Sequence, residues 1–287
     1  RMFPTAASEV LEQLVKVGFG LFFAYRFQGN IERAVVYLLL SVSLSELAAL
    51  FLMLAFFKRT KKEEKIKNEV ALSTILKLSI PVTFSSMVIP LSGLLDSVLA
   101  PRLLSGYATD AVALYGLFAG GAVTVINLPV SVCYGLAAAS VPRVATEIGK
   151  GKQGKPRKRI LQALGLTAFL GGGSAVGLYL FAEPAAKIIF RSLTGEELRT
   201  LVGLIEAFSI SAFTLSCSQT LSACLTAQGK PQHAALSMLI AMTVKTVLYY
   251  GWLKNPNYSV FALVYATNIA YGVAFLLDLL YNLISLI

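Results

Sequence analysis

The chain has 287 residues, of which 56% are hydrophobic and 14% are charged, and its mean hydropathy is +0.71. Soluble domains carry about 25% charged residues, so the composition excludes an ordinary soluble domain and indicates a polytopic protein of the lipid bilayer. The net charge of +10 would suit a nucleic-acid-binding protein. The basic residues are concentrated in two short loops, however, so we expect no nucleic-acid partner.

Apolar segments of roughly 20 residues or more can cross a bilayer as helices. The sequence predicts an all-α transmembrane bundle of about eight such spans. In chain order they are residues 5–25, 34–57, 71–101, 111–141, 160–182, 200–228, 232–253 and 259–287. The first is the least apolar, because Glu9, Glu12 and Lys16 interrupt it.

Two loops contain most of the positive charge. Residues 58–67 and residues 150–159 each carry six lysine or arginine side chains. The positive-inside rule places both loops, and the side of residue 1, in the cytoplasm. Residues 183–199, where basic and acidic residues are balanced, are expected to form a loop on the other side.

The charged segment 58–70 divides two predicted spans from six. We interpret it as a basic cytoplasmic linker between residues 1–57, the last two helices of an N-terminal lobe, and residues 71–287, the six helices of a C-terminal lobe. The chain begins on Arg1 and ends within apolar sequence, so we expect a fragment of a longer protein. Four further spans would give six plus six helices, the layout of a two-repeat transporter.

The third span holds Pro81, Pro90 and Asp96 in otherwise apolar sequence. Proline bends a helix, and an acidic side chain at membrane depth costs at least a few kcal/mol. At about 100° per residue, Ser85, Ser92 and Asp96 share a narrow stripe. We interpret this stripe as a cavity-lining face with a Na⁺ or proton site at Asp96 and hinges at both prolines. The alternative is a structural carboxylate paired with a lysine or arginine of a neighbouring helix.

The fourth span carries a second polar stripe at helical spacing, with a bend expected at Pro129. Its candidate cavity-lining residues are Thr124, Asn127 and Ser131. The stripe is either a solute-facing wall or a surface for hydrogen bonds between helices.

Further candidates lie beyond this stripe. Arg143 and Glu147 are four residues apart, so they form either an ion pair with each other or an inner gate that contacts an anionic headgroup. Gln219, Lys245 and Asn268 are cavity-lining candidates, with structural pairing as the alternative. Lys245 has two possible partners, Asp96 and Asp278, and the sequence does not choose between them.

Motifs for catalysis are absent from the sequence. It contains no Walker A loop, no GxSxG elbow and no HExxH pair. His233 is the only histidine, and the three cysteines lack metal-ligand spacing. We therefore expect no enzyme activity, no metal site and no organic cofactor.

Three stretches of the chain resemble motifs of a known protein family. They are LSIPVTFSSMVIPLSGLLDSVLAPRLL, INLPVSVCYGLAAASVPRVATEIGKGK and ACLTAQGKPQHAALSMLIAMTVKTVLYY. Together they resemble the polysaccharide-biosynthesis branch of the multidrug/oligosaccharidyl-lipid/polysaccharide (MOP) exporter superfamily. Within that branch the chain is similar to the stage V sporulation protein B group, which is related to lipid II flippases.

The resemblance implies a two-lobe, MATE-like fold of 12 or more helices, of which this chain holds helices five to twelve. It implies a flippase that moves a lipid-linked oligosaccharide or peptidoglycan precursor across the bacterial cytoplasmic membrane by alternating access. The sequence does not determine the oligomeric state, for which a monomer is our expectation. Asp96 resembles a sodium-site carboxylate of lipid II flippases. Tyr249 and Asp278, however, stand where relatives often carry Asn, so the coupling ion is left open between Na⁺ and H⁺.

Two alternatives to a flippase remain. One is a cation-coupled multidrug exporter of the MATE type. The other is a non-transporting membrane scaffold in cell-wall or spore-cortex assembly.

Overall fold

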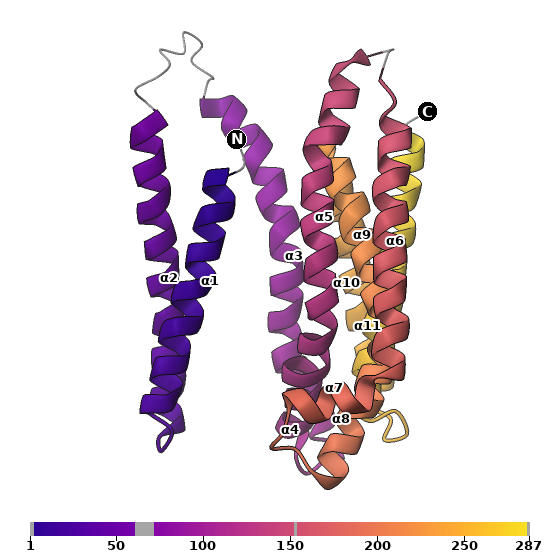
Figure 1. Ribbon diagram of the computed structural model, residues 1–287. Helices are drawn as coiled ribbons and strands as arrows, with labels where there is room; N and C mark the ends of the chain where they lie inside the picture. The colour runs from indigo at the N-terminus through magenta and orange to yellow at the C-terminus, as the bar shows by residue number, and fades with distance from the viewer. Residues whose placement is uncertain (1–2, 61–71, 152–153, 286–287) are drawn as a thin grey trace. The chain divides into compact units, whose positions relative to one another are not determined.

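The computed structural model describes residues 3–60, 72–151 and 154–285, and every regular element in these ranges is a helix (Figure 1). The chain divides into two compact units, Arg1–Ala71 and Leu72–Ile287. Of the expected linker, residues 58–60 belong to a helix that ends at Thr60. Residues 61–70 lie outside the described ranges.

Unit 1 is a hairpin of two long helices, α1 (Phe3–Arg26) and α2 (Ile31–Thr60). The side-chain oxygen of Asn30 accepts a hydrogen bond from the backbone N–H of Arg33 at 3.1 Å, which caps the start of α2. The rings of Phe27 and Tyr37 stack with centroids 4.5 Å apart, so aromatic packing fixes the two helices at the turn.

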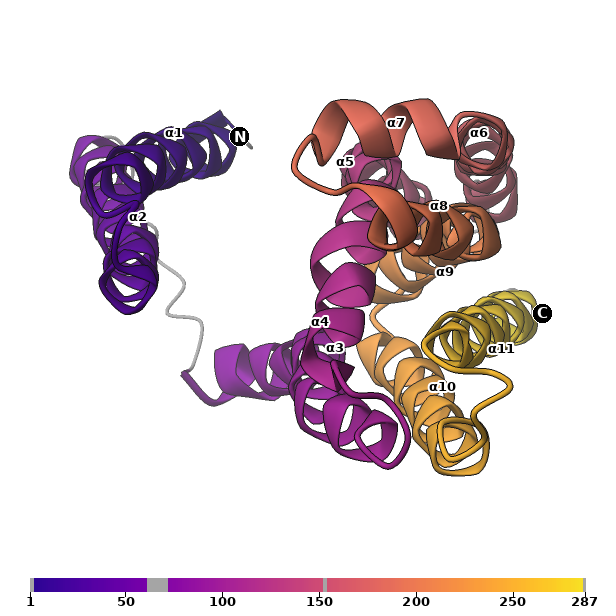
Figure 2. The ribbon, with the colours of Figure 1, turned by 90° about the horizontal axis from the view of Figure 1, so that it is seen from below.

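Unit 2 is a helical bundle, seen end-on in Figure 2. In chain order its elements are α3 (Leu72–Leu104), α4 (Ala111–Gly116), the π-helix η1 (Leu117–Ala122), α5 (Val123–Gly149), α6 (Pro156–Leu180), α7 (Ala182–Ile189), α8 (Gly195–Phe208), α9 (Ile210–Ala227), α10 (Pro231–Trp252) and α11 (Phe261–Ser285). The connections α5–α6 and α9–α10 lie at one end of the bundle. The connections α3–α4 and α10–α11 lie at the other end (Figure 1).

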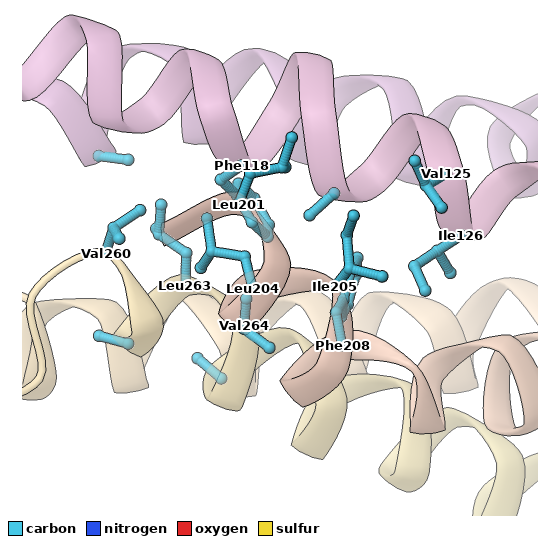
Figure 3. Close-up of a cluster of buried hydrophobic side chains, with 14 of the residues drawn as sticks. Phe118, Val125, Ile126, Leu201, Leu204, Ile205, Phe208, Val260, Leu263 and Val264 are labelled. Atoms are coloured by element: carbon cyan, nitrogen blue, oxygen red, sulfur yellow. The ribbon is translucent and has the colours of Figure 1, made fainter. Parts of the chain in front are cut away.

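The main apolar core of unit 2 surrounds α8 (Figure 3). One face of α8 is fully buried, and it packs against side chains of η1, α5 and α11. The buried residues of this contact include Leu201, Leu204, Ile205, Phe208, Phe118, Val125, Ile126, Leu263 and Val264. The cluster therefore fixes the end of the bundle opposite the α5–α6 connection.

In the described part of the chain, six helical segments are long and apolar enough to cross a membrane, or seven if the bent pair α8 and α9 is one span. Helix α1 is long enough, but Glu9, Glu12 and Lys16 make it less apolar, as its sequence indicated. The chain is therefore a multi-pass, all-α membrane protein, and the predicted fold class is confirmed.

The predicted single span 200–228 is wrong in one respect. The structure divides this region into α8 and α9, which meet at Ser209 with a bend of 44°. The hydroxyl of Ser209 donates to the carbonyl of Glu206 at 2.8 Å, and its backbone N–H bonds the same carbonyl. Serine back-bonding of this kind bends helices, which accounts for the break.

The expected loop 183–199 is largely helical. It contains most of α7 and the beginning of α8. Helix α7 is amphipathic: Ala182 and Ala186 are buried, whereas Glu183 and Lys187 form an exposed ion pair at 2.6 Å. A short helix that lies flat on the end of the bundle makes its own backbone hydrogen bonds and buries two alanines. A count of hydropathy over the segment does not detect such a helix.

The fourth span is longer and less regular than predicted. It continues from Ala111 to Gly149 as α4, η1 and α5, with the π-helical turn near its start. Gly121 explains the close packing there, because a Cβ atom at this position would lie 2.5 Å from Cδ1 of Leu201. A larger residue at this position would therefore require the Leu201 side chain to shift.

Candidate functional site

The most deeply buried charge pair in the described structure joins α3 to α10. Nζ of Lys245 lies 2.6 Å from Oδ2 of Asp96, and the two side chains are only 4% and 11% exposed. The lysine ammonium also lies 5.6 Å from the ring centroid of Tyr249, a favourable cation–π geometry. Of the two partners that the sequence left open for Lys245, the structure selects Asp96.

The other stripe residues of α3 are described in part. Ser92 is buried one turn before Asp96, so the two lie on the same inward face. Pro90 is exposed, and α3 continues through it as a helix. The side chains of Pro81 and Ser85 lie outside the described residues.

A second buried carboxylate, Asp278 of α11, was not among the residues predicted to form the site. It is completely buried and accepts hydrogen bonds from Ser218 and Ser222 of α9, at 2.7 and 2.8 Å, and from Ser237 of α10. No described lysine, arginine or histidine lies within ion-pair distance of it. Its charge therefore faces only hydroxyl groups.

The three serine hydroxyls around Asp278 form a hydroxyl cage, and amide side chains extend it toward the α9–α10 connection. Asn282 donates to the carbonyl of Leu221 at 3.1 Å and accepts from the side chain of Gln228 at 2.8 Å. The only sequence signal for the cage was the spacing of Ser218 and Ser222, which places two hydroxyls on one face of α9. Nothing local to either helix indicates that Asp278 lies opposite that face.

Helix α10 contacts both buried carboxylates. Ser237 bonds Asp278, and Lys245 bonds Asp96. The two α10 residues are eight positions apart, which is about 12 Å along a helix. Unit 2 therefore contains two separate acidic sites within its membrane-spanning helices, one with a cationic partner and one with hydroxyl partners.

The polar stripe of α5 lies on the surface of unit 2. Thr124, Asn127 and Ser131 are exposed, whereas the opposite face of the helix is buried against α6 and α9. Ser131 satisfies its own hydroxyl on the carbonyl of Asn127 at 2.7 Å. Pro129 lies within the same helix and is half-buried. The hydrogen bonds to other helices that were the alternative for this stripe are therefore not seen for Ser131.

Asn268 and Gln219 lie away from the α5 stripe. Asn268 donates to the carbonyl of Ala207 at 2.7 Å and accepts from the hydroxyl of Ser211, so it links α11 to both sides of the α8–α9 break. Gln219 is half-buried, and its carbonyl oxygen has no hydrogen-bond partner among the described residues. Their assignment to a cavity wall stays a prediction.

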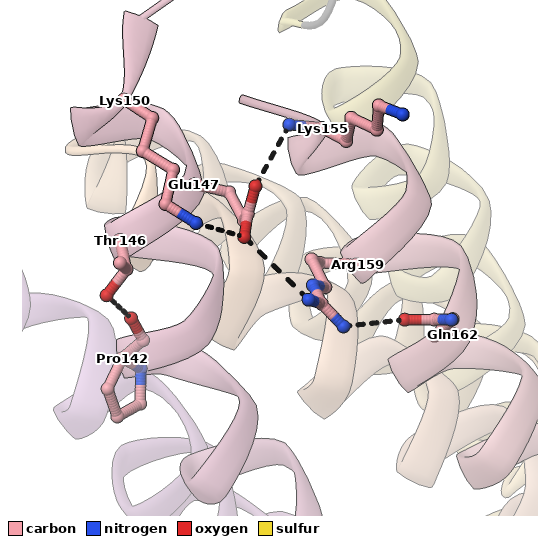
Figure 4. Close-up of polar contacts among 7 residues, drawn as sticks. All are labelled: Pro142, Thr146, Glu147, Lys150, Lys155, Arg159 and Gln162. Atoms are coloured by element: carbon pink, nitrogen blue, oxygen red, sulfur yellow. Dashed lines mark hydrogen bonds and ion pairs between the residues drawn. The ribbon is translucent and has the colours of Figure 1, made fainter. Parts of the chain in front are cut away.

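No ion pair between Arg143 and Glu147 is seen in the described part of the chain. Glu147 instead accepts hydrogen bonds from Lys150 at 2.9 Å and from the backbone N–H of Lys155 at 3.1 Å, and it lies 3.8 Å from Arg159 (Figure 4). The α5–α6 connection folds back over Glu147 and brings these donors to it. No described residue forms an ion pair with Arg143.

These features define the class: a multi-pass membrane protein with buried charge sites and an exposed polar helix face at membrane depth. The polysaccharide biosynthesis protein family matches residues 1–147, and the MatE family matches residues 81–250. Each match covers more than half of the chain, so the chain belongs to this group of families, which are members of the MOP superfamily. The resemblance read from the sequence is confirmed.

Individual relatives agree with this assignment. The chain is 28% identical to stage V sporulation protein B of Bacillus subtilis (strain 168), over 89% of this chain and 51% of that protein. It is similar in fold to MATE in the bent conformation, at 14% identity and a TM-score of 0.72, covering 98% of this chain and 61% of the other. The inward closed lipid II flippase MurJ matches at 17% identity and a TM-score of 0.63, covering 96% and 55%. The chain thus spans about half the length of the curated relative.

Proposed function

We propose that this chain is part of a flippase that moves a lipid-linked oligosaccharide or peptidoglycan precursor across the bacterial cytoplasmic membrane by alternating access. The observation that carries the proposal is the exposed polar stripe of α5. Polar side chains of membrane helices normally face a protein interior or water, because lipid leaves them unsatisfied. Here Thr124, Asn127 and Ser131 are exposed on unit 2, next to the exposed Leu128 and Val132, and the polar groups support a hydrated pathway along this face.

The chemistry of the stripe suits a sugar headgroup. Its groups are two hydroxyls and an amide, all neutral, and they offer both donors and acceptors to sugar hydroxyls. The match of residues 1–147 to the polysaccharide biosynthesis protein family and the likeness to a lipid II flippase support the same substrate class. A multidrug exporter of the MATE type is the second candidate, because the MatE family matches residues 81–250.

For coupling we propose a proton rather than Na⁺ at Asp96. The ammonium of Lys245 already occupies the position 2.6 Å from the carboxylate where a bound cation would lie. A Na⁺ ion about 4 Å from that ammonium would meet a repulsion of about 4 kcal/mol at an effective dielectric constant of 20. A proton that moves onto the carboxylate breaks the pair without adding a second cation beside it. The Asp96–Lys245 pair is therefore the proton-responsive element of the proposal.

The test uses the full-length protein reconstituted in vesicles with a fluorescent lipid-linked oligosaccharide. We expect the double variant Asn127→Leu/Ser131→Ala to lower transport by a factor of about 10 to 30, as two lost hydrogen bonds of about 1 kcal/mol each predict. Thr226→Val is the matched control, since Thr226 is an exposed hydroxyl at the end of α9 with a similar local bond to Ser222.

Three outcomes would contradict the proposal. Unchanged transport in the double variant would show that the stripe does not line the pathway. Export of organic cations without movement of the lipid-linked sugar would favour the multidrug exporter. Intact cell-wall assembly in a strain whose protein transports neither substrate would favour the scaffold.

A further inference from the structure

A basic pocket lies between α5 and α6, and neither buried carboxylate is among its lining residues. It has a volume of about 130 Å³ and is lined by Ser140, Arg143, Val144, Arg159, Gln162, Ala163 and Leu166. Two guanidinium groups, a hydroxyl and an amide form its polar side, and aliphatic side chains form the rest. The pocket therefore combines an anion-binding wall with an apolar floor.

The charge around the pocket is strongly positive. Arg143 has no ion-pair partner in the described ranges. The one described carboxylate near Arg159, that of Glu147, lies 3.8 Å away, so this charge is weakly compensated.

A wider hollow of about 630 Å³ shares Gln162 with the pocket and adds Lys155, Arg157 and Lys158. Glu147 is already bonded by Lys150 and by the backbone of Lys155. The surplus of cations favours an anionic ligand with oxygen acceptors, such as a phosphate.

A separate apolar groove lies further along the same helix, α6. It has a volume of about 560 Å³ and is lined by Phe169, Leu170, Gly172, Gly173, Ser174 and Val176. Arg159, Leu166 and Gly173 are spaced seven apart, so successive members lie within about 20° of each other around α6. They are also about 10 Å apart along it. Along one face of α6, the charged Arg159 is therefore followed by the aliphatic Leu166 and then by the groove at Gly173.

The face that bears this pocket differs from the polar stripe proposed for transport. Arg143 is twelve residues after Ser131, which places it about 120° around α5. Beside the pocket, α6 exposes large apolar side chains, among them Leu161, Leu166 and Phe169, as a helix face against lipid does. The ligand therefore approaches from the bilayer and not from the transport pathway.

We propose that this surface binds an anionic phospholipid of the surrounding membrane. The headgroup phosphate lies between Arg143 and Arg159, and one acyl chain follows Leu166 into the groove at Gly173. Charge selects an anionic headgroup over a zwitterionic one, and the groove selects a lipid over free phosphate. The site is independent of the transported substrate, so it stands whether or not the proposed transport function does.

The test is native mass spectrometry of the full-length protein with phosphatidylglycerol, phosphatidylcholine and inorganic phosphate as probes. We expect phosphatidylglycerol to bind and Arg143→Gln to weaken it about fivefold, which corresponds to the roughly 1 kcal/mol per basic side chain found near anionic bilayers. Gly173→Leu places a side chain in the groove, and its Cβ atom would meet nothing within 4 Å. This variant should weaken phosphatidylglycerol binding and leave phosphate binding unchanged.

Arg199→Gln is the matched control, since it removes one exposed arginine from α8 at the other end of the bundle. It should leave lipid binding unchanged. Equal binding of phosphatidylcholine, or full binding by Arg143→Gln, would overturn the headgroup site. Phosphatidylglycerol binding that is insensitive to Gly173→Leu would show a site for a free anion and not for a lipid. Circular dichroism of each variant excludes a loss of fold as the cause.

Discussion

Lys245 and Asp96 are 149 residues apart in the sequence, yet Nζ of the lysine lies 2.6 Å from Oδ2 of the aspartate. The contact joins α10 to α3, the first helix of unit 2. Both side chains are nearly inaccessible, so neither charge has water as a substitute partner. The stability of this junction and the protonation of the pair are therefore linked.

The first prediction concerns that link. Asp96→Asn leaves the Lys245 ammonium buried and unpaired, and Lys245→Met leaves the carboxylate in the same condition. Each should lower the free energy of unfolding by about 3–5 kcal/mol, whereas the double variant removes both charges and should recover most of the loss. Denaturant titration of the full-length protein in mild detergent measures all three. A double variant as unstable as the worse single variant would show that packing, and not charge, explains the cost.

The second prediction concerns Asp278 and its three serine partners. Asp278→Leu removes the shared acceptor of Ser218, Ser222 and Ser237, and of these hydroxyls only that of Ser237 has another bond in the described structure, to the carbonyl of Ala234 at 3.1 Å. We expect the free energy of unfolding to fall by about 3 kcal/mol. Asp278→Asn keeps one oxygen acceptor, and the hydroxyls can rotate to accept from the new amide. This variant should therefore lower the free energy of unfolding by about 1 kcal/mol. The same denaturant titration separates them. An equal loss of unfolding free energy in both variants would mean that side-chain volume, and not hydrogen bonding, determines stability at this position.

The third prediction concerns the close packing of η1 on α8. Gly121→Ala places a methyl group 2.5 Å from Cδ1 of Leu201, so this fully buried side chain must shift, and we expect the free energy of unfolding to fall by about 1–3 kcal/mol. Gly120→Ala is the matched control, because its Cβ would meet nothing within 4 Å. That change should be neutral or stabilising by up to about 1 kcal/mol, as expected of alanine in a helix. A loss of stability in the control as large as that in Gly121→Ala would contradict the steric explanation.

The sequence predicted the helices well, because apolar length is a local property. Segments such as 232–253 and 259–287 correspond closely to α10 and α11. It was less successful at 183–199 and 200–228, where a two-alanine contact and one serine back-bond decide the local structure. Both features depend on neighbouring backbone, which hydropathy does not report.

Sequence reasoning identified half of the buried charge chemistry. Asp96 was found because a lone carboxylate in an apolar helix is costly, and Lys245 was found for the same reason. Their pairing depends on the packing of α3 against α10, so spacing alone did not choose it over Asp278. The cage of Asp278 was missed because its three hydroxyls come from two helices 41 to 60 residues away in the chain. Each serine alone has the appearance of an ordinary helix residue.

The fourth prediction concerns the coupling ion. If the tethered ammonium of Lys245 takes the place of a mobile cation, transport should be unchanged when choline replaces Na⁺ at constant pH, and should respond to a proton gradient. Lys245→Met removes the tethered cation and leaves the Asp96 carboxylate without its cationic partner. That variant should therefore acquire a dependence on Na⁺ that the unaltered protein lacks, measured as the initial rate at increasing Na⁺ concentration. A strong Na⁺ dependence of the unaltered protein would contradict the assignment, because Na⁺ would then bind beside the ammonium or at another site.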